Sequence, residues 1–84
     1  MIRVVLVDDQ ALVRAGLSRI LGPEEDMEIV AECTDGSEVE AAVAETHPDI
    51  VVMDVRMKNV DGTEATRRVR AKPDAPPVLT LTTF

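Results

Sequence analysis

Two short apolar runs, each closed by aspartate, constrain the fold of this chain more than any other feature. The first run, residues 2–7, ends at Asp8 and Asp9. The second run, residues 50–53, ends at Asp54. Short runs rich in β-branched residues are typical of strands that are buried on both faces of a parallel sheet. Open α/β sheets bind ligands in the crevice outside the carboxyl ends of their strands, so this is where the three acids are expected.

The rest of the chain alternates between helix-like and strand-like patterns. The pairs Asp35 with Glu38 and Asp61 with Glu64 have the spacing of capping boxes, and Asp9 is expected to cap the first helix. The expected elements are strand 2–7, helix 10–21, strand 27–32, a helix that begins after residue 35 and ends near 47, strand 49–54, helix 61–70 and strand 78–82.

This series predicts one α/β domain over residues 1–84, with a parallel sheet and right-handed crossovers. We expect the strand order 2-1-3-4, with the first helix on one face of the sheet and the other two helices on the opposite face. The strand over residues 78–82 is expected at an open edge of the sheet. An open, β-branched edge favours self-association between copies of the chain.

Composition excludes several classes of partner. Nine Lys and Arg face sixteen Asp and Glu, a net charge of −7, which argues against direct nucleic-acid binding and against docking on an anionic membrane. A single Phe, with no Tyr or Trp, leaves no platform for stacking nucleic-acid bases. No apolar run approaches the roughly 18 residues of a membrane helix. The single cysteine, Cys33, excludes an internal disulfide and fits the cytoplasm.

Three carboxylates brought together repel one another, and a cation relieves that repulsion. All of their ligand atoms are oxygens, which hard divalent cations prefer. Asp8, Asp9 and Asp54 therefore predict a site for Mg²⁺.

The chain also resembles a known family, the receiver domains of bacterial two-component response regulators. It is most similar to receivers of regulators with a LuxR-type helix-turn-helix output domain. The resemblance rests on the acid pair, the strand that ends in aspartate and the Asp-Gly turn, which occur in the family's order and spacing. The segments that carry it are VVLVDDQALVRAGLSRIL, PDIVVMDVRMKNVDGTEATRRVR and PPVLTLTTF. It implies a flavodoxin-like fold and a phosphoryl-accepting module, not an enzyme, that takes its phosphoryl group from a sensor histidine kinase.

The resemblance also implies a role for particular residues. Asp54 is the implied phosphoacceptor, Asp9 a direct Mg²⁺ ligand, and Asp8 an acid that acts partly through water. Arg56 would offer its backbone carbonyl to the metal. Thr82, at the tip of the fourth strand, would offer its hydroxyl to the phosphoryl oxygens, with Thr80 and Thr83 as rivals for that place.

The sequence departs from the family pattern in two places. Lys58 stands where the family usually has proline, in the loop after the phosphoacceptor. The family's lysine on a fifth strand has no counterpart in residues 1–84, which are therefore expected to form an incomplete receiver domain without an output domain. This departure implies weak or short-lived phosphorylation.

Two other functions remain open from the residues. One is an interaction fragment that has no phosphoryl chemistry. The other is a small phosphatase with an aspartate nucleophile, although such enzymes usually place Asp-x-Asp after the first strand, and Asp8 and Asp9 are adjacent. Of the remaining candidate residues, Asp49 is expected to be structural, His47 to lie in a surface loop, and Cys33 to be a buried apolar residue.

Overall fold

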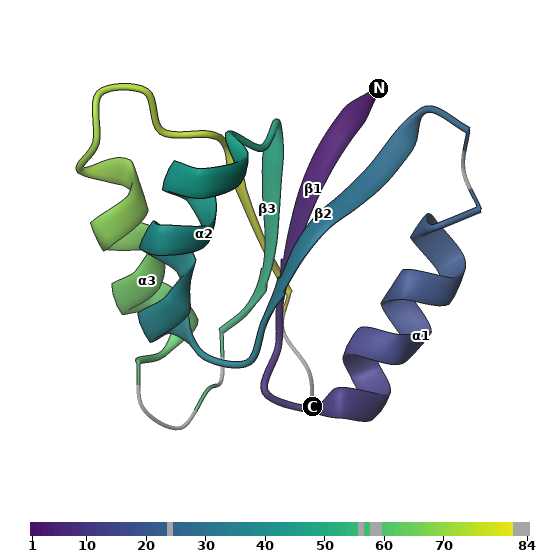
Figure 1. The fold of residues 1–84 in the computed structure, drawn as a ribbon. Helices are drawn as coiled ribbons and strands as arrows, with labels where there is room; N and C mark the ends of the chain where they lie inside the picture. Colours follow the sequence, from purple (N-terminus) through teal and green to yellow (C-terminus); the bar gives the residue numbers. More distant parts are fainter. Residues whose placement is uncertain (24, 56, 58–59, 82–84) are drawn as a thin grey trace.

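Four parallel strands form the centre of the molecule (Figure 1). The computed structural model describes residues 1–23, 25–55, 57 and 60–81. The strands are β1 (Ile2–Val7), β2 (Met27–Cys33), β3 (Ile50–Asp54) and β4 (Val78–Leu81). Their spatial order is β2-β1-β3-β4, which confirms the predicted sheet and its order.

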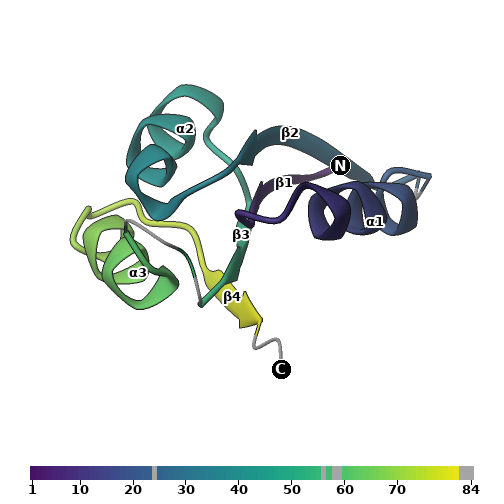
Figure 2. The same cartoon turned by 90° about the horizontal axis from the view of Figure 1, so that it is seen from below.

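The helices cover the two faces of the sheet unequally. Helix α1 (Ala11–Leu21) lies on one face, while α2 (Val39–Thr46) and α3 (Gly62–Arg70) lie side by side on the other, as predicted (Figures 1 and 2). A 3₁₀ turn, η1 (Gly36–Glu38), leads directly into α2.

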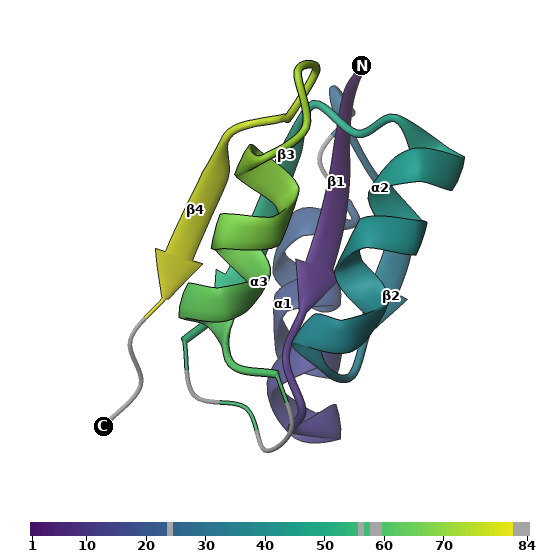
Figure 3. The same cartoon turned by 90° about the vertical axis from the view of Figure 1, so that its left-hand side faces the viewer.

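The face under α2 and α3 carries the main core of the molecule (Figure 3). Strand side chains that point to this face are almost fully buried against one residue of α2 and two of α3. The strand residues are Val5 and Val7 of β1 and Val51 and Met53 of β3, and the helix residues are Val39 of α2 and Ala65 and Val69 of α3. On the α1 face none of the α1 residues, all of which the structure describes, is buried, and Leu12 is 89% exposed. Leu79 of β4 is 52% exposed.

Two of the three predicted helix caps are present. Asp35 and Glu38 form the full capping box, at the start of η1. The Asp61 carboxylate accepts a hydrogen bond from the backbone N–H of Glu64. The carboxylate of Glu64 binds Arg67 and Arg68 on the next turn, and those contacts lower its pKa to about 2.

The predicted cap of α1 by Asp9 is wrong. The N-cap residue of α1 is Gln10, and no side-chain hydrogen bond caps this helix. The Asp8 carboxylate accepts from the backbone N–H of Gln10 at 2.8 Å, so Asp8 holds the turn that leads into the helix. Asp9 lies instead with the other acids at the end of the sheet.

Among the described residues, no helix is both long enough and apolar enough to span a bilayer.

Candidate functional site at the carboxyl end of the sheet

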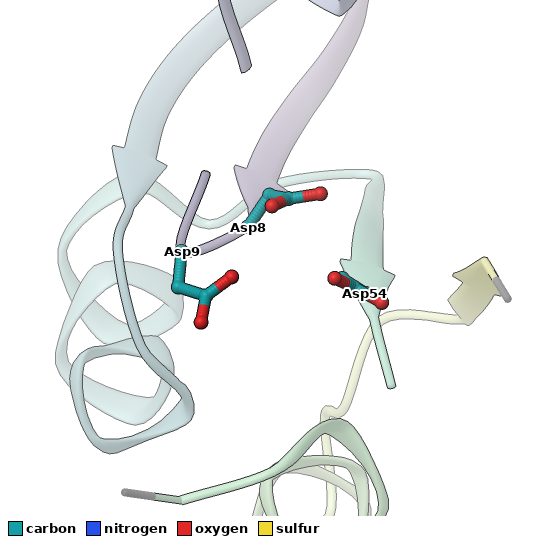
Figure 4. Close-up of side chains that lie close together, drawn as sticks. All are labelled: Asp8, Asp9 and Asp54. Atoms are coloured by element: carbon teal, nitrogen blue, oxygen red, sulfur yellow. The ribbon is translucent and has the colours of Figure 1, made fainter. Parts of the chain in front are cut away.

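The carboxylates of Asp8, Asp9 and Asp54 converge at the carboxyl ends of β1 and β3. One ligand oxygen of each lies within 4.8 Å of the ligand oxygens of the other two. In Figure 4, Asp8 and Asp9 come from the turn after β1 and face Asp54 at the tip of β3. This confirms the predicted convergence of the three side chains.

The strand register explains why these residues meet. Strands β1 and β3 are hydrogen-bonded neighbours, and their last aligned pair is Val7 with Met53. Asp8 and Asp54 follow that pair directly, so two carboxylates leave adjacent strands at the same level. The backbone N–H of Asp8 is held by the carbonyl of Cys33 at 3.1 Å, which ties the end of β1 to the end of β2.

Burial makes the negative charge of this site costly. Asp8 is 2% exposed and Asp54 is 3% exposed. Burial is the largest cause that raises the pKa of the Asp8 carboxyl above its ordinary value. The hydrogen bond from Gln10 opposes this rise, while the charges of Asp54 and Asp9 add to it. Asp8 therefore holds its negative charge at a cost in free energy.

Arg14, which the sequence analysis missed, carries the positive charge that opposes this cost. Its Nη1 donates to the backbone carbonyl of Asp8 at 2.6 Å, and its charge lowers the pKa of Asp8 by the smallest of the contributions. Its Nε also lies 3.7 Å from Oε1 of Glu32, so the guanidinium is shared with another acid. The helical stripe of α1 carries no signal for this contact, because Arg14 acts on the backbone of the preceding turn.

The donor set suits a hard divalent cation. Three carboxylates supply only oxygen ligands, two of them buried, and their spread is small enough for a single ion to contact more than one. A cation here would replace mutual repulsion by attraction.

The other candidate residues lie away from this cluster. Asp49 precedes β3 and pairs with the backbone of Arg3, so its predicted structural role is confirmed. His47 is exposed, has a left-handed backbone (φ 48°) and ends α2. It lines a cavity of about 350 Å³ at the amino end of the sheet, remote from the three carboxylates. Cys33 is buried, as predicted, and burial raises its pKa to about 11.

Comparison with known proteins decides the family. A model of the response regulator receiver domain matches residues 4–84. The chain belongs to the response regulator receiver domains. Members of this family take part in two-component signalling, and the parallel sheet with order β2-β1-β3-β4 is the receiver fold.

Similar sequences occur in proteins named as response regulators or as transcriptional regulatory proteins. The chain is 40% identical over 84 residues to the transcriptional regulatory protein LiaR of Bacillus subtilis, and covers 100% of itself and 40% of that protein. It is 40% identical over 83 residues to the response regulator protein VraR of Staphylococcus aureus, covering 99% of itself and 40% of VraR. The chain thus spans about two-fifths of the length of these curated relatives.

A solved structure agrees in fold. The two-component response regulator of the LuxR family from Aurantimonas sp. SI85-9A1 matches with a TM-score of 0.92 and 38% identity. The match covers 100% of this receiver and 60% of that chain.

Three predicted features of the receiver lie outside the described residues. They are the backbone carbonyl of Arg56, the hydroxyl of Thr82 and the departure at Lys58. Thr80, a rival of Thr82, is described: it is exposed and aligns with Met53 in the pairing of β3 with β4.

Proposed function

We propose that this receiver accepts a phosphoryl group on Asp54 from a sensor histidine kinase, with Mg²⁺ bound by the neighbouring acids. The observation that carries the proposal is the convergence of Asp54 with Asp8 and Asp9 at the carboxyl end of the sheet. An isolated carboxylate at a strand end does not neutralise the charge of a phosphoryl group. A carboxylate beside two others forms a site for a divalent cation, and the cation supplies that neutralisation.

The transfer uses Asp54 as a nucleophile. One carboxylate oxygen of Asp54 attacks the phosphorus of the donor, and a new oxygen–phosphorus bond forms. The bond between phosphorus and the donor's histidine nitrogen breaks, and the electron pair stays with the imidazole. The product is an acyl phosphate on Asp54 and a free histidine on the kinase.

The other two acids have different roles in this proposal. Asp9 would bind the cation directly, and Asp8, which is more deeply buried and also holds the Gln10 turn, would act partly through water. Bound Mg²⁺ supplies neutralisation of the phosphoryl oxygens, which is the main requirement of phosphoryl transfer. The backbone carbonyl of Arg56 and the hydroxyl of Thr82 belong to the same proposal, as further ligands of the cation and of the phosphoryl group.

The output of the signal is proposed from the relatives. LiaR is named as a transcriptional regulatory protein, and the matched structure from Aurantimonas is a LuxR-family regulator. We propose that phosphorylation of this receiver controls transcription through a DNA-binding region, while the receiver itself does not contact DNA.

Labelling with a small phosphodonor tests the proposal. The chain is incubated with Mg²⁺ and acetyl phosphate, and the modified residue is located by mass spectrometry. Label is expected on Asp54 and is expected to disappear in Asp54→Asn. The matched control is Asp49→Asn, which makes the same change just before the other end of β3 and is expected to leave labelling intact. Label that persists in Asp54→Asn contradicts the assignment. Unlabelled wild type, in the presence of Mg²⁺, favours an interaction module without phosphoryl chemistry.

A further inference from the structure

The end of β2 and the turn after it contact the end of β1, which leads into Asp8, and the segment before α3, which follows Asp54. At the last residue of β2, the carbonyl of Cys33 accepts from the backbone N–H of Asp8 at 3.1 Å. Two residues later, the Asp35 carboxylate accepts from the backbone N–H of Val60, 3.2 Å from Oδ2 and 3.3 Å from Oδ1. The N–H of Gly36 donates to the carbonyl of Val60 at 3.0 Å. One short turn therefore holds the end of β1 and the approach to α3 together.

Gly62, two residues after Val60, lies in close contact with the backbone of Asp54. The backbone N–H of Gly62 donates to the carbonyl of Val55 at 2.9 Å. A Cβ on Gly62 would collide with the carbonyl oxygen of Asp54, so only glycine permits this approach. The start of α3 thus rests on the backbone of Asp54 and Val55, and its position depends on where Val60 is held.

Helix capping alone does not explain the contacts of Asp35. The cap accounts for the hydrogen bonds that the carboxylate accepts from the backbone N–H of Ser37, at 2.9 Å from Oδ2, and from the backbone N–H of Glu38. The bond to Val60 reaches across 25 residues of sequence and is made by a carboxylate that is 8% exposed. Charge-assisted bonds from backbone N–H groups to a buried carboxylate are among the stronger hydrogen bonds of a protein.

We infer that Asp35 is a positioning residue for the phosphoacceptor: through Val60 and Gly62 it fixes the backbone at Asp54 opposite Asp8 and Asp9. The inference rests on the proposed function, since it assigns a consequence for phosphoryl transfer. It goes further by placing a positioning residue in the turn between β2 and η1, which carries none of the three acids. Fixed geometry is what phosphoryl transfer needs, and displacements of about 1 Å can cost on the order of a hundredfold in rate.

Three substitutions separate positioning from capping. Asp35→Ser keeps a good N-cap oxygen, but its shorter side chain cannot reach Val60. Asp35→Asn keeps an acceptor at full length and serves as the conservative rescue. Glu38→Ala removes the other half of the capping box, the bonds from Thr34 and Asp35, and leaves the contact with Val60 in place.

Two readouts are measured on each variant, after a thermal melt has shown that it folds. The first is the initial rate of Asp54 labelling by acetyl phosphate at saturating Mg²⁺. We expect Asp35→Ser to slow labelling by about tenfold or more, while Asp35→Asn and Glu38→Ala stay within about threefold of wild type. The second is amide hydrogen exchange at Gly62, which is expected to quicken in Asp35→Ser only.

The outcomes distinguish this inference from the proposed function. If wild type is labelled and Asp35→Ser is labelled at the same rate, the positioning role is overturned while phosphoryl acceptance stands. If wild type is not labelled, the proposed function fails, and exchange at Gly62 alone decides whether Asp35 holds the Asp54 backbone. An equal fall in the labelling rate of Asp35→Ser and Glu38→Ala would assign Asp35 to helix capping only. If Asp35→Ser does not fold, Gly36→Ala takes its place, because a Cβ at Gly36 would collide with the carbonyl oxygen of Val60 and displace that residue. A slow labelling rate in Gly36→Ala, with a wild-type rate in Asp35→Asn, then supports the inference. Wild-type rates in both variants overturn it.

Discussion

The two ends of the sheet use the same residue type for opposite purposes. At the carboxyl end, Asp54 closes β3 next to two further carboxylates. At the amino end, Asp49 immediately precedes β3, and its Oδ2 accepts from the backbone N–H of Arg3 at 2.7 Å. The N–H of Asp49 in turn donates to the carbonyl of Arg3 at 2.8 Å. One carboxylate completes a hydrogen-bonded corner, whereas the other adds to a repulsive group.

The surroundings of Arg3 extend this contrast. Its guanidinium donates to the carbonyl of Thr46 at 2.6 Å and lies 3.8 Å from Oε2 of Glu28. At the amino end, the carboxylates of Asp49 and Glu28 therefore each have a partner on Arg3. At the carboxyl end, Asp8 is buried beside the like charges of Asp54 and Asp9, and the Arg14 guanidinium that opposes them is shared with Glu32. A buried group of like charges is the kind of site at which we expect function, whereas a carboxylate held by the backbone is structural.

The largest expected effect is on cation affinity at the carboxyl end. Asp9→Asn removes one of the three charges that attract Mg²⁺ and is expected to raise its dissociation constant by at least about tenfold, as loss of supporting groups at metal sites does. Isothermal titration with Mg²⁺ measures the change. An unaltered dissociation constant would place the cation outside this cluster.

The second effect is on stability without metal. The folded-state pKa of Asp8 is raised, so its contribution to stability is present at low pH and is lost as the pH rises through that pKa. Asp8→Asn removes this cost and is expected to stabilise the metal-free chain at pH 7 by about 1 kcal/mol, or a Tm higher by about 4–8 °C.

Thermal melts in a chelator, at pH 7 and again near pH 4, check the sign. The advantage of Asp8→Asn over wild type is expected to shrink at the lower pH, where wild-type Asp8 takes up a proton. A variant that is less stable than wild type at both values contradicts the idea of a strained carboxyl end.

The smallest effect is expected at the amino end. Asp49→Asn keeps one acceptor oxygen for the N–H of Arg3 but weakens a charge-assisted bond at an exposed position. We expect a loss of about 0.5–1 kcal/mol in the free energy of unfolding, read from urea titration, with Mg²⁺ affinity unchanged. A change in Mg²⁺ affinity would blur the distinction between the two ends.

Sequence patterns predicted the features that depend on periodicity and on strand ends. Alternation of apolar strands with helices predicted the parallel sheet, while its strand order came from the flavodoxin-like fold. The runs that end at Asp8 and Asp54 predicted the convergence of the acids. The capping box at Asp35 was also visible, because caps depend on spacing of three residues.

Contacts that depend on tertiary geometry were not predictable in this way. A capping motif predicts that the Asp35 carboxylate accepts from a backbone N–H of the next turn, such as that of Ser37. It does not predict that this carboxylate also accepts from the N–H of Val60, 25 residues away. The cap of α1 failed for a related reason: Asp8 and Asp9 are equivalent in the sequence pattern, and only the turn of the backbone decides which one binds the N–H of Gln10.

One matched pair of thermal melts tests most directly whether the carboxyl end of the sheet is a cation site and the amino end is not. Asp54→Asn and Asp49→Asn make the same change at the two ends of β3. Mg²⁺ at about ten times its dissociation constant should stabilise wild type by about 1.4 kcal/mol. We expect Asp49→Asn to keep this Mg²⁺-dependent rise in Tm and Asp54→Asn to lose most of it. Equal rises in the two variants, or no rise in wild type, would contradict this expectation.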